Sequence, residues 1–344
     1  MNSERCRRRC RSPVVVRNVS QPQAATGALG RTPAVHLLSV RARSLGRMST
    51  TLGLVGVPSS AAAHWPGQEK APAALRPAGL IGLLREAGLI VEDHGDRPVA
   101  RWRPHPTERQ PHNLTGVLDV LSDTRAQVSR IFEAGQIPLV VGGECTLAIA
   151  LYSAAVAHDE DMALLYFDGG QDLSNDPDNP ESVLDGLGVR HLLDLPGTAP
   201  VLAGFGPRRP LLSPERLCFF GYGEPEEDRD GLVPSPRFPA SDVRADPRVA
   251  ALRALTALAA DRFVVHFDVD VIDFYDLPVA DVPLYNKGLT TAEAMTALSE
   301  FAAQPGFAGM TFAEFNPDHG EQDGSTTRIL TEALARALGP LADR

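Results

Sequence analysis

Long apolar runs are missing from this 344-residue sequence, and no stretch approaches the ~18 consecutive apolar residues that suggest a membrane-spanning helix. We therefore expect no membrane partner. Net positive charge is missing as well, because 43 Asp and Glu outweigh 33 Lys and Arg and leave a net charge of −10. A general nucleic-acid binder needs a basic face, so we expect no nucleic-acid partner either.

Cysteine is scarce, with four residues in the whole chain: Cys6, Cys10, Cys145 and Cys218. Such a sequence is not a disulfide scaffold, and a reducing cytosol is the expected setting, so we predict a cytoplasmic protein. Cys6 and Cys10 lack partner ligands at zinc-site spacing. Cys218, within "RLCFFGYG", is expected to be a small apolar residue on a buried strand.

The charge is unevenly distributed along the chain. Ten arginines and one acid precede Met48, a balance of +9, so the remainder carries −10 − 9 = −19. This change of sign predicts a basic, disordered tail or a non-native upstream extension over residues 1–47, followed by a single domain over residues 48–344. An organelle transit peptide is the alternative for the first segment, because it is rich in Arg and Ser and poor in acids.

From residue 51 the sequence alternates short apolar runs with amphipathic stretches. The amphipathic stretches predict helices over 71–88, 114–135, 145–159, 246–261, 291–304 and about 324–339. The apolar runs predict strands over 51–57, 89–93, 137–143, 162–168, 217–223, 262–270 and 307–317. The apolar runs are continuous rather than alternating, which is typical of a mostly parallel sheet covered by helices on both faces. The stretches 177–210 and 224–245 are expected to be loops and short connections.

Four predicted strands end in residues with useful chemistry. Ligands bind at the carboxyl ends of the strands in open parallel sheets, so these residues predict a site. They are Glu144 and Cys145 in "GGECT", Asp168 and Asp172 in "DGGQD", His266, Asp268 and Asp270 in "HFDVDVID", and Glu314 in "AEFNP".

The D-x-D sequence is the most informative of the four. Side chains alternate along a strand, so His266, Asp268 and Asp270 are expected to point the same way. Neighbouring carboxylates that are partly desolvated repel each other, and a divalent cation is the usual remedy. A lone D-x-D is weak evidence, because such acids often cap a turn. Its combination with D-x-x-x-D at another strand end favours a metal site.

Taken in this order and spacing, the four segments resemble the arginase/agmatinase (ureohydrolase) superfamily. The resemblance covers roughly residues 51 to 340 and includes "GVP" (56–58), "ALRPAGL" (74–80) and "DHGD" (93–96), which are similar to the family's first βα unit. It implies a three-layer α/β/α domain with a mostly parallel sheet of about eight strands. It also implies assembly as a homo-oligomer, a trimer or a hexamer.

The family's usual site holds two Mn²⁺ ions, and the resemblance implies a divergent member that lacks both histidine ligands. Cys145 stands where the family's G-G-D-H-S has its histidine, and Gly170 stands where D-A-H-x-D has its histidine. Glu314 resembles the acid that holds the substrate's guanidinium, and Asp185, in "VLDGLG", falls about where the family places a catalytic histidine. The implied metal ligands are Cys145, Asp168, Asp172, Asp268 and Asp270.

The cysteine is also similar to a subgroup that hydrolyses hydroxyguanidines such as hydroxyarginine in natural-product pathways. That subgroup keeps the second histidine, so Gly170 departs from it too. A thiolate suits Zn²⁺ or Fe²⁺ better than the family's Mn²⁺. His266 would be a ligand only if its ring swings to the metal, and the favoured reading places it one layer deeper, hydrogen-bonded in the core.

Three functional hypotheses follow. The first is a hydrolase that acts on a C–N bond of a guanidino or related small-molecule substrate, in specialised metabolism, with a weakened or single-metal site. The second is a metal-independent enzyme in which Cys145 is the nucleophile or a protonated aspartate is the acid. The third is an inactive binding or assembly protein. In the first two, the catalytic residues are expected to be Asp172, Asp185, Glu314 and Cys145.

Overall fold

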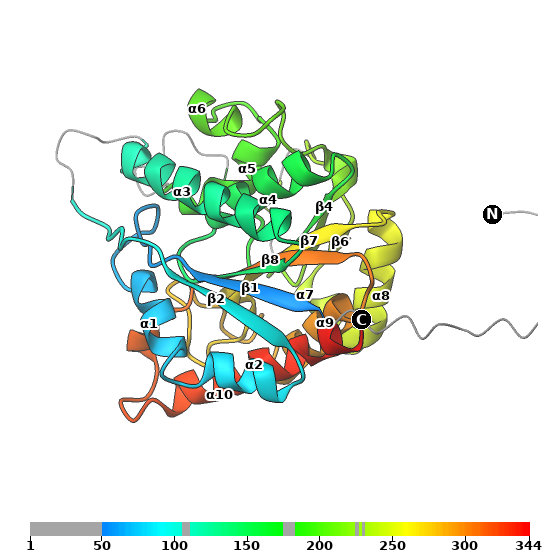
Figure 1. The fold of residues 1–344 in the computed structure, drawn as a ribbon. Coiled ribbons are helices and arrows are strands. Elements are labelled where there is room, and N and C mark those ends of the chain that lie inside the picture. Colours follow the sequence, from blue (N-terminus) through cyan, green and yellow to red (C-terminus); the bar gives the residue numbers. More distant parts are fainter. Residues whose placement is uncertain (1–49, 105–110, 175–182, 224–226, 229–230) are drawn as a thin grey trace, which may run out of the picture. The chain divides into compact units, whose positions relative to one another are not determined.

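The computed structural model describes residues 50–104, 111–174, 183–223, 227–228 and 231–344. Its strands form one eight-stranded sheet in the order β2-β1-β3-β8-β7-β4-β5-β6, and every neighbouring pair of strands is parallel (Figure 1). The predicted parallel α/β fold is therefore confirmed. The strands are β1 (Thr51–Gly56), β2 (Ile90–Asp96), β3 (Ile137–Val141), β4 (Ala163–Phe167), β5 (Leu217–Phe220), β6 (Arg237–Phe238), β7 (Phe263–Asp268) and β8 (Phe307–Ala313).

Helices cover both faces of the sheet, as continuous apolar strands require. On one face lie α3 (Leu114–Glu133), α4 (Leu147–His158), α5 (Gly188–Leu192) and α6 (Pro200–Ala203). On the other lie α1 (Ala71–Leu75), α2 (Leu80–Glu86), α7 (Ala240–Ala245), α8 (Pro247–Leu258), α9 (Thr291–Ala302) and α10 (Ser325–Leu338). The sheet thus separates two apolar cores, which gives the predicted three layers.

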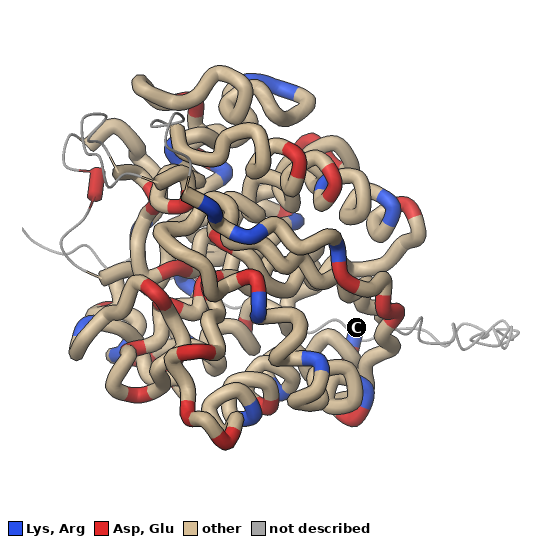
Figure 2. Tube along the Cα trace, turned by 90° about the vertical axis from the view of Figure 1, so that its left-hand side faces the viewer, with Lys and Arg blue, Asp and Glu red and all other residues tan. Residues whose placement is uncertain are grey.

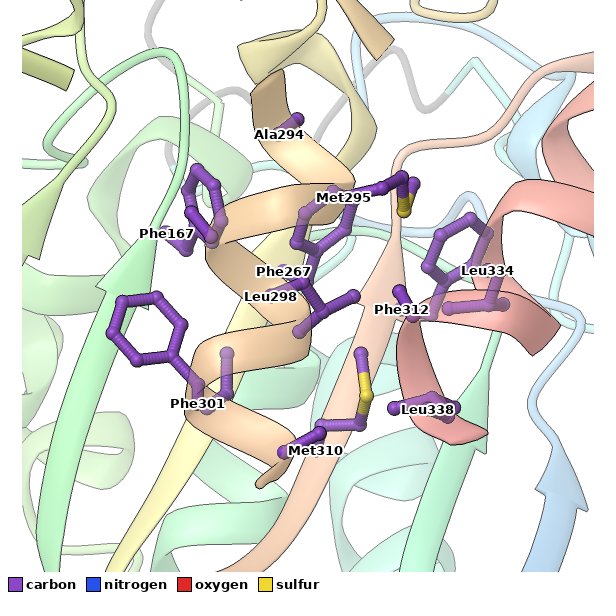
Figure 3. Close-up of a cluster of buried hydrophobic side chains, with 14 of the residues drawn as sticks. Phe167, Phe267, Ala294, Met295, Leu298, Phe301, Met310, Phe312, Leu334 and Leu338 are labelled. Carbon is purple, nitrogen blue, oxygen red and sulfur yellow. The ribbon is translucent and has the colours of Figure 1, made fainter. Parts of the chain in front are cut away.

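The apolar core between the sheet and α9 and α10 holds in place the strands that carry the predicted site. Figure 3 shows α9 lying across the sheet, with Phe301 beside Phe167 of β4, Phe267 behind the helix and Phe312 at its side, toward α10. The rings of Phe267 and Phe312 stack with their centroids 5.7 Å apart. Because side chains alternate along a strand, the residues on either side of Phe167 and Phe267 face the opposite core, toward α4. These are the residues of the predicted site.

One predicted helix, 71–88, is two helices in the structure. Pro77 has no N–H for a helical hydrogen bond, and Gly79 has φ +96°, a conformation that favours glycine. The chain therefore leaves α1 at Leu75 and re-enters a helix at Leu80. The segment before α1 lies alongside the end of β8, where Gln68 donates to Glu314.

Several shorter elements were not predicted. The 177–210 stretch contains η2 (Asp185–Leu187), α5 and α6, and the 224–245 stretch contains β6 and α7. Short 3₁₀ turns also occur as η1 (Gln68–Lys70), η3 (Pro214–Arg216), η4 (Val269–Val271), η5 (Pro317–His319) and η6 (Gly339–Asp343). Elements of two to six residues carry too little periodicity to be recognised in a sequence.

Cys218 lies on β5 and is fully buried, as predicted. Among the described residues, none of the helices is both long and apolar enough to span a bilayer. Acidic and basic positions are interspersed in the view of Figure 2. The predictions made for residues 1–47 lie outside the described part of the chain, so that domain boundary stays a prediction.

Candidate functional site

The site begins where β3 ends. Gly142 and Gly143 follow this strand with φ +97° and +81°, and they turn the chain so that Cys145 precedes the first turn of α4. A Cβ at residue 142 would fall 2.7 Å from Pro72, so the turn is also sterically restricted to glycine. The N–H of Glu314 donates to the carbonyl of Gly143 at 2.9 Å, which joins this turn to the end of β8.

Four donor groups meet beside this turn, with one ligand atom of each lying within 4.8 Å of the others: Cys145, Asp168, His266 and Asp268. Cys145 Sγ lies 2.7 Å from Asp268 Oδ2 and 3.6 Å from Asp168 Oδ2. His266 Nε2 lies 3.3 Å from the same sulfur and 3.5 Å from Asp168 Oδ2. Three of these residues are among the five predicted metal ligands, and His266 joins them.

His266 combines the two alternatives that the sequence left open. Its ring is fully buried in the core and stacks on Tyr166, with a centroid distance of 4.5 Å. Its Nδ1 is hydrogen-bonded to Thr311 Oγ1 at 2.7 Å, and its Nε2 faces the donor group. The strand register explains this arrangement, because His266 of β7 pairs with Tyr166 of β4 and Thr311 of β8. A histidine whose Nδ1 is held by an oxygen has its Nε2 oriented for a metal or for a thiol.

Asp185 and Glu314 form a second group with Cys145, with one ligand atom of each again within 4.8 Å of the others. Asp185 Oδ1 accepts the N–H of Cys145 at 2.7 Å. Glu314 has φ +66°, which is strained for a residue with a side chain and is common at functional sites. Two of the three predicted catalytic carboxylates, Asp185 and Glu314, are therefore beside Cys145, and Asp185 reaches it from η2, 40 residues further along the chain.

Asp172 and Asp270, the other two predicted ligands, take different partners. Asp172 has φ +51° and accepts a hydrogen bond from the Tyr166 hydroxyl. Asp270 does not continue the alternation of β7, because the strand ends at Asp268 and the turn η4 follows. Asp270 Oδ1 instead accepts the N–H of Gly169 at 2.8 Å, across to the end of β4. Their role as metal ligands stays a prediction.

Glu227 lies beside the residue that lacks the expected histidine. A Cβ at residue 170 would fall 3.0 Å from Glu227 Oε1 and 3.4 Å from Asp168 Oδ1. The Glu227 carboxylate accepts the N–H of Gln171 at 2.9 Å and that of Leu173 at 2.8 Å. This carboxylate therefore occupies the start of the path that a side chain at residue 170 would follow.

The site is strongly acidic. Burial, reinforced by neighbouring carboxylates, raises the pKa of Asp185 to about 7. Burial also raises the pKa of the Cys145 thiol, and the acids around it raise that pKa further. The other carboxyl groups whose pKa burial raises are Glu144, Asp172, Glu227, Asp268, Asp270 and Glu314.

Basic side chains do not neutralise these acids in the part of the chain that the structure describes. The salt bridges formed there join none of them to an arginine or a lysine, and the one basic group in contact is His266, beside Asp168. Buried carboxylates at this spacing hold shared protons or a cation.

The donor set fits a cation. Four ligands at ~2.0–2.3 Å from a tetrahedral centre lie about 3.3–3.8 Å from one another. Three of the four contacts measure 3.3–3.6 Å, and the contact between Cys145 and Asp268 at 2.7 Å would have to widen. One sulfur, one nitrogen and two oxygens favour Zn²⁺ or Fe²⁺ over Mn²⁺.

Gln68, Glu227 and Thr311 were not recognised from the sequence. Gln68 donates to Glu314, Glu227 binds the loop after β4, and Thr311 orients His266. Thr311 could have been proposed from the sequence, because it lies three residues before Glu314 on β8, the strand next to β7. Gln68 and Glu227 lie in segments without motifs, so only the folded chain reveals them.

Comparison with known proteins agrees with this fold. A family model described as the arginase family matches residues 50–339. Arginase-1 of Homo sapiens is 26% identical over 301 residues, which cover 84% of this chain and 92% of that protein. Arginase of Bacillus subtilis is 24% identical over 295 residues, covering 83% of this chain and 98% of its own.

Solved structures show the same fold. The arginase of Bacillus caldovelox superposes with a TM-score of 0.75 at 23% identity, covering 85% of this chain and 99% of its own. The formimidoylglutamase of Bacillus subtilis superposes with a TM-score of 0.65 at 21% identity, covering 85% of this chain and 87% of its own.

Proposed function

Because the chain belongs to the arginase family, we propose that it hydrolyses a C–N bond of a guanidino or related substrate with a single divalent cation. The proposed ligands are Cys145, Asp168, His266 and Asp268. The observation that supports this proposal is their convergence, with one donor atom of each within 4.8 Å of the others. When bound, such a cation supplies Lewis acidity that lowers the pKa of water at the site.

The remaining residues have roles that follow from their contacts. Glu314 offers acceptor oxygens for the N–H groups of a guanidino group. Asp185, with a pKa of about 7, is suited to take a proton from water and return it to the departing amine near neutral pH. The N–H of Cys145 holds this carboxylate in place at 2.7 Å. Tyr166 holds Asp172, and the raised pKa of its hydroxyl keeps it a donor.

The direct test is metal analysis of protein purified without added metal, combined with assays of urea release from arginine, agmatine and hydroxyarginine. We expect close to one Zn²⁺ or Fe²⁺ per chain and activity that disappears with a chelator and returns with the metal. Metal-free protein without any C–N hydrolysis would contradict the proposal and leave a binding or assembly role. Cytoplasmic location and assembly as a trimer or hexamer are part of the same proposal.

A metal-independent enzyme is the second candidate, and the contact of 3.3 Å between His266 Nε2 and Cys145 Sγ favours it. His266 would accept the thiol proton, and the thiolate would attack the amidino carbon. The amine would leave with a proton, and water would then release urea and restore the thiol. The raised pKa of Cys145 opposes thiolate formation without a cation, so the metal-dependent reaction is preferred.

The Cys145→Ser substitution separates the two candidates. In the metal-dependent reaction, loss of the thiolate should lower affinity for Zn²⁺ by at least about 10-fold, because the hydroxyl is a weaker and harder ligand. In the metal-independent reaction, activity should vanish although wild-type protein contains no metal. Cys218→Ala is the matched control, since Cys218 is an equally buried cysteine on β5 outside the site. Unchanged metal binding and unchanged activity in Cys145→Ser would contradict both candidates.

A further inference from the structure

The turn η1 packs closely against the segment that follows β8. An added Cβ at Gly67 would fall 2.1 Å from Asn316 Nδ2, so only glycine permits this approach. The next residue, Gln68, is 1% exposed, and its Nε2 donates to Glu314 Oε2. A side chain from a loop remote in sequence is thereby brought to the carboxylate expected to meet the substrate.

Two oxygens at this contact accept no hydrogen bond from an N–H or hydroxyl group among the described residues. They are Oε1 of Gln68 and Oε1 of Glu314, and both belong to side chains that are at least 97% buried. Burying an acceptor without a donor is unfavourable, so such atoms in a folded protein call for a donor. Glu314 also lies in one group with Asp185 and Cys145, so the two oxygens border the site.

The contact changes what Glu314 can bind. A free carboxylate can receive two parallel N–H groups on its two oxygens. Here Gln68 already donates to one of these oxygens, and the Glu314 side chain also shares a hydrogen bond with Asp185, so a ligand that takes the remaining oxygen must replace Asp185 there. The second acceptor is then the neutral carboxamide oxygen of Gln68. The pair presents two acceptor oxygens, and the one from the carboxamide carries no charge.

We propose that Gln68 is a specificity-determining residue that, together with Glu314, receives the N–H groups of a guanidino or amidino substrate. The proposal rests on the proposed function and narrows its substrate class to planar groups with at least two N–H donors. The same geometry disfavours cations without donors, because they would leave both buried oxygens unpaired.

The test is binding of small cations to the full-length protein, measured by calorimetry and independent of turnover. The probes are methylguanidinium, which carries N–H donors, and tetramethylammonium, which carries the same charge without donors. We expect wild-type protein to bind methylguanidinium more tightly than tetramethylammonium. Gln68→Met should weaken that binding by about 10-fold, since a hydrogen bond to a charged group accounts for roughly this factor. Metal content should stay unchanged in the variant.

Lys70→Met is the matched control, because it removes the salt bridge of η1 to Asp318 and leaves the carboxamide in place. If Gln68 acts only by holding η1, this control should lose methylguanidinium binding as well. Should Gln68→Met not fold, Gln68→Asn, which withdraws the amide by one methylene, should show the same loss.

Equal methylguanidinium binding by wild type and the Gln68 variants would overturn the inference, while the proposed hydrolase would stand on its own assays. Failure of wild-type protein to bind methylguanidinium would overturn it too. Loss of hydrolysis with binding retained would contradict the proposed function alone.

Discussion

At the scale of single residues, the orientation of His266 depends on one hydroxyl. The ring lies between Tyr166 and Thr311, and Thr311 Oγ1 is the only described partner of Nδ1, at 2.7 Å. In proteins that bind metals, the group holding the outer nitrogen of a histidine fixes the tautomer and the ring plane. Thr311 therefore influences the site through the outer nitrogen of His266 and not as a ligand itself.

We predict that Thr311→Val lowers metal affinity by about 10- to 100-fold, in line with the loss of other outer partners of metal-binding histidines. The two side chains have nearly the same shape, so the fold should persist. Titration of the chelated protein with Zn²⁺ measures the effect. Thr331→Val is the control, because Thr331 is equally buried and its hydroxyl donates to Thr327 within α10. A variant that binds Zn²⁺ as tightly as wild type would show that His266 is no ligand.

At the scale of elements, the loop after β4 is organised around the carboxylate of Glu227. Gly170 has an ordinary backbone conformation, so a side chain there is not excluded by φ. The obstacle is Glu227 Oε1, 3.0 Å from the Cβ position. A side chain at residue 170 and the Glu227 carboxylate thus compete for the same space, so placing a histidine there requires changes at both residues.

We therefore predict that Gly170→His alone destabilises the protein by about 2–4 kcal/mol, because Glu227 must give up the N–H groups of Gln171 and Leu173. Adding Glu227→Ala should make the pair less unfavourable than the sum of the two single changes by at least about 1 kcal/mol. Denaturant unfolding of the four proteins measures this coupling. Gly116→His is the control, since an added Cβ there meets nothing within 4 Å. Strict additivity would refute the steric link.

At this scale, part of the fold and of the candidate site could be predicted from the sequence and part could not. The parallel sheet, the long helices and the acids at the strand ends were predictable, because continuous apolar runs and motif spacing are local signals. The position of Asp270 was not, since a 3₁₀ turn interrupts the alternation directly after Asp268. The partners Gln68 and Glu227 were not predictable either. Gln68 contacts Glu314, 246 positions along the chain. Glu227 contacts Gln171 and Leu173, which are 56 and 54 positions away. Only the folded chain creates these contacts.

At the scale of the whole molecule, buried and exposed acids respond to pH in different windows. Exposed or half-exposed carboxyls such as Asp93 and Asp123 have a lowered pKa because of arginine partners, so their stabilising effect is lost only as pH falls below about 4. The buried acids of the site behave oppositely. Their folded-state pKa is raised, so the folded chain binds more protons than the unfolded chain between about pH 4 and the folded pKa. Metal-free protein must therefore lose stability as pH rises through that range.

We predict that chelated protein is more stable at pH 5 than at pH 8. Asp185 alone, with a pKa shifted from 3.8 to about 7, accounts for about 3 kcal/mol of this difference, because the ~2 pH units between pH 5 and its folded pKa count at ~1.4 kcal/mol each. A bound cation replaces the protons, so Zn²⁺ should stabilise the protein more at pH 8 than at pH 5. Urea unfolding at both pH values, with chelator and with Zn²⁺, measures both effects. Asp185→Asn keeps the shape without the charge and should flatten the pH dependence. Chelated protein that is more stable at pH 8 would mean that the site's acids are already neutralised by groups other than protons or a cation.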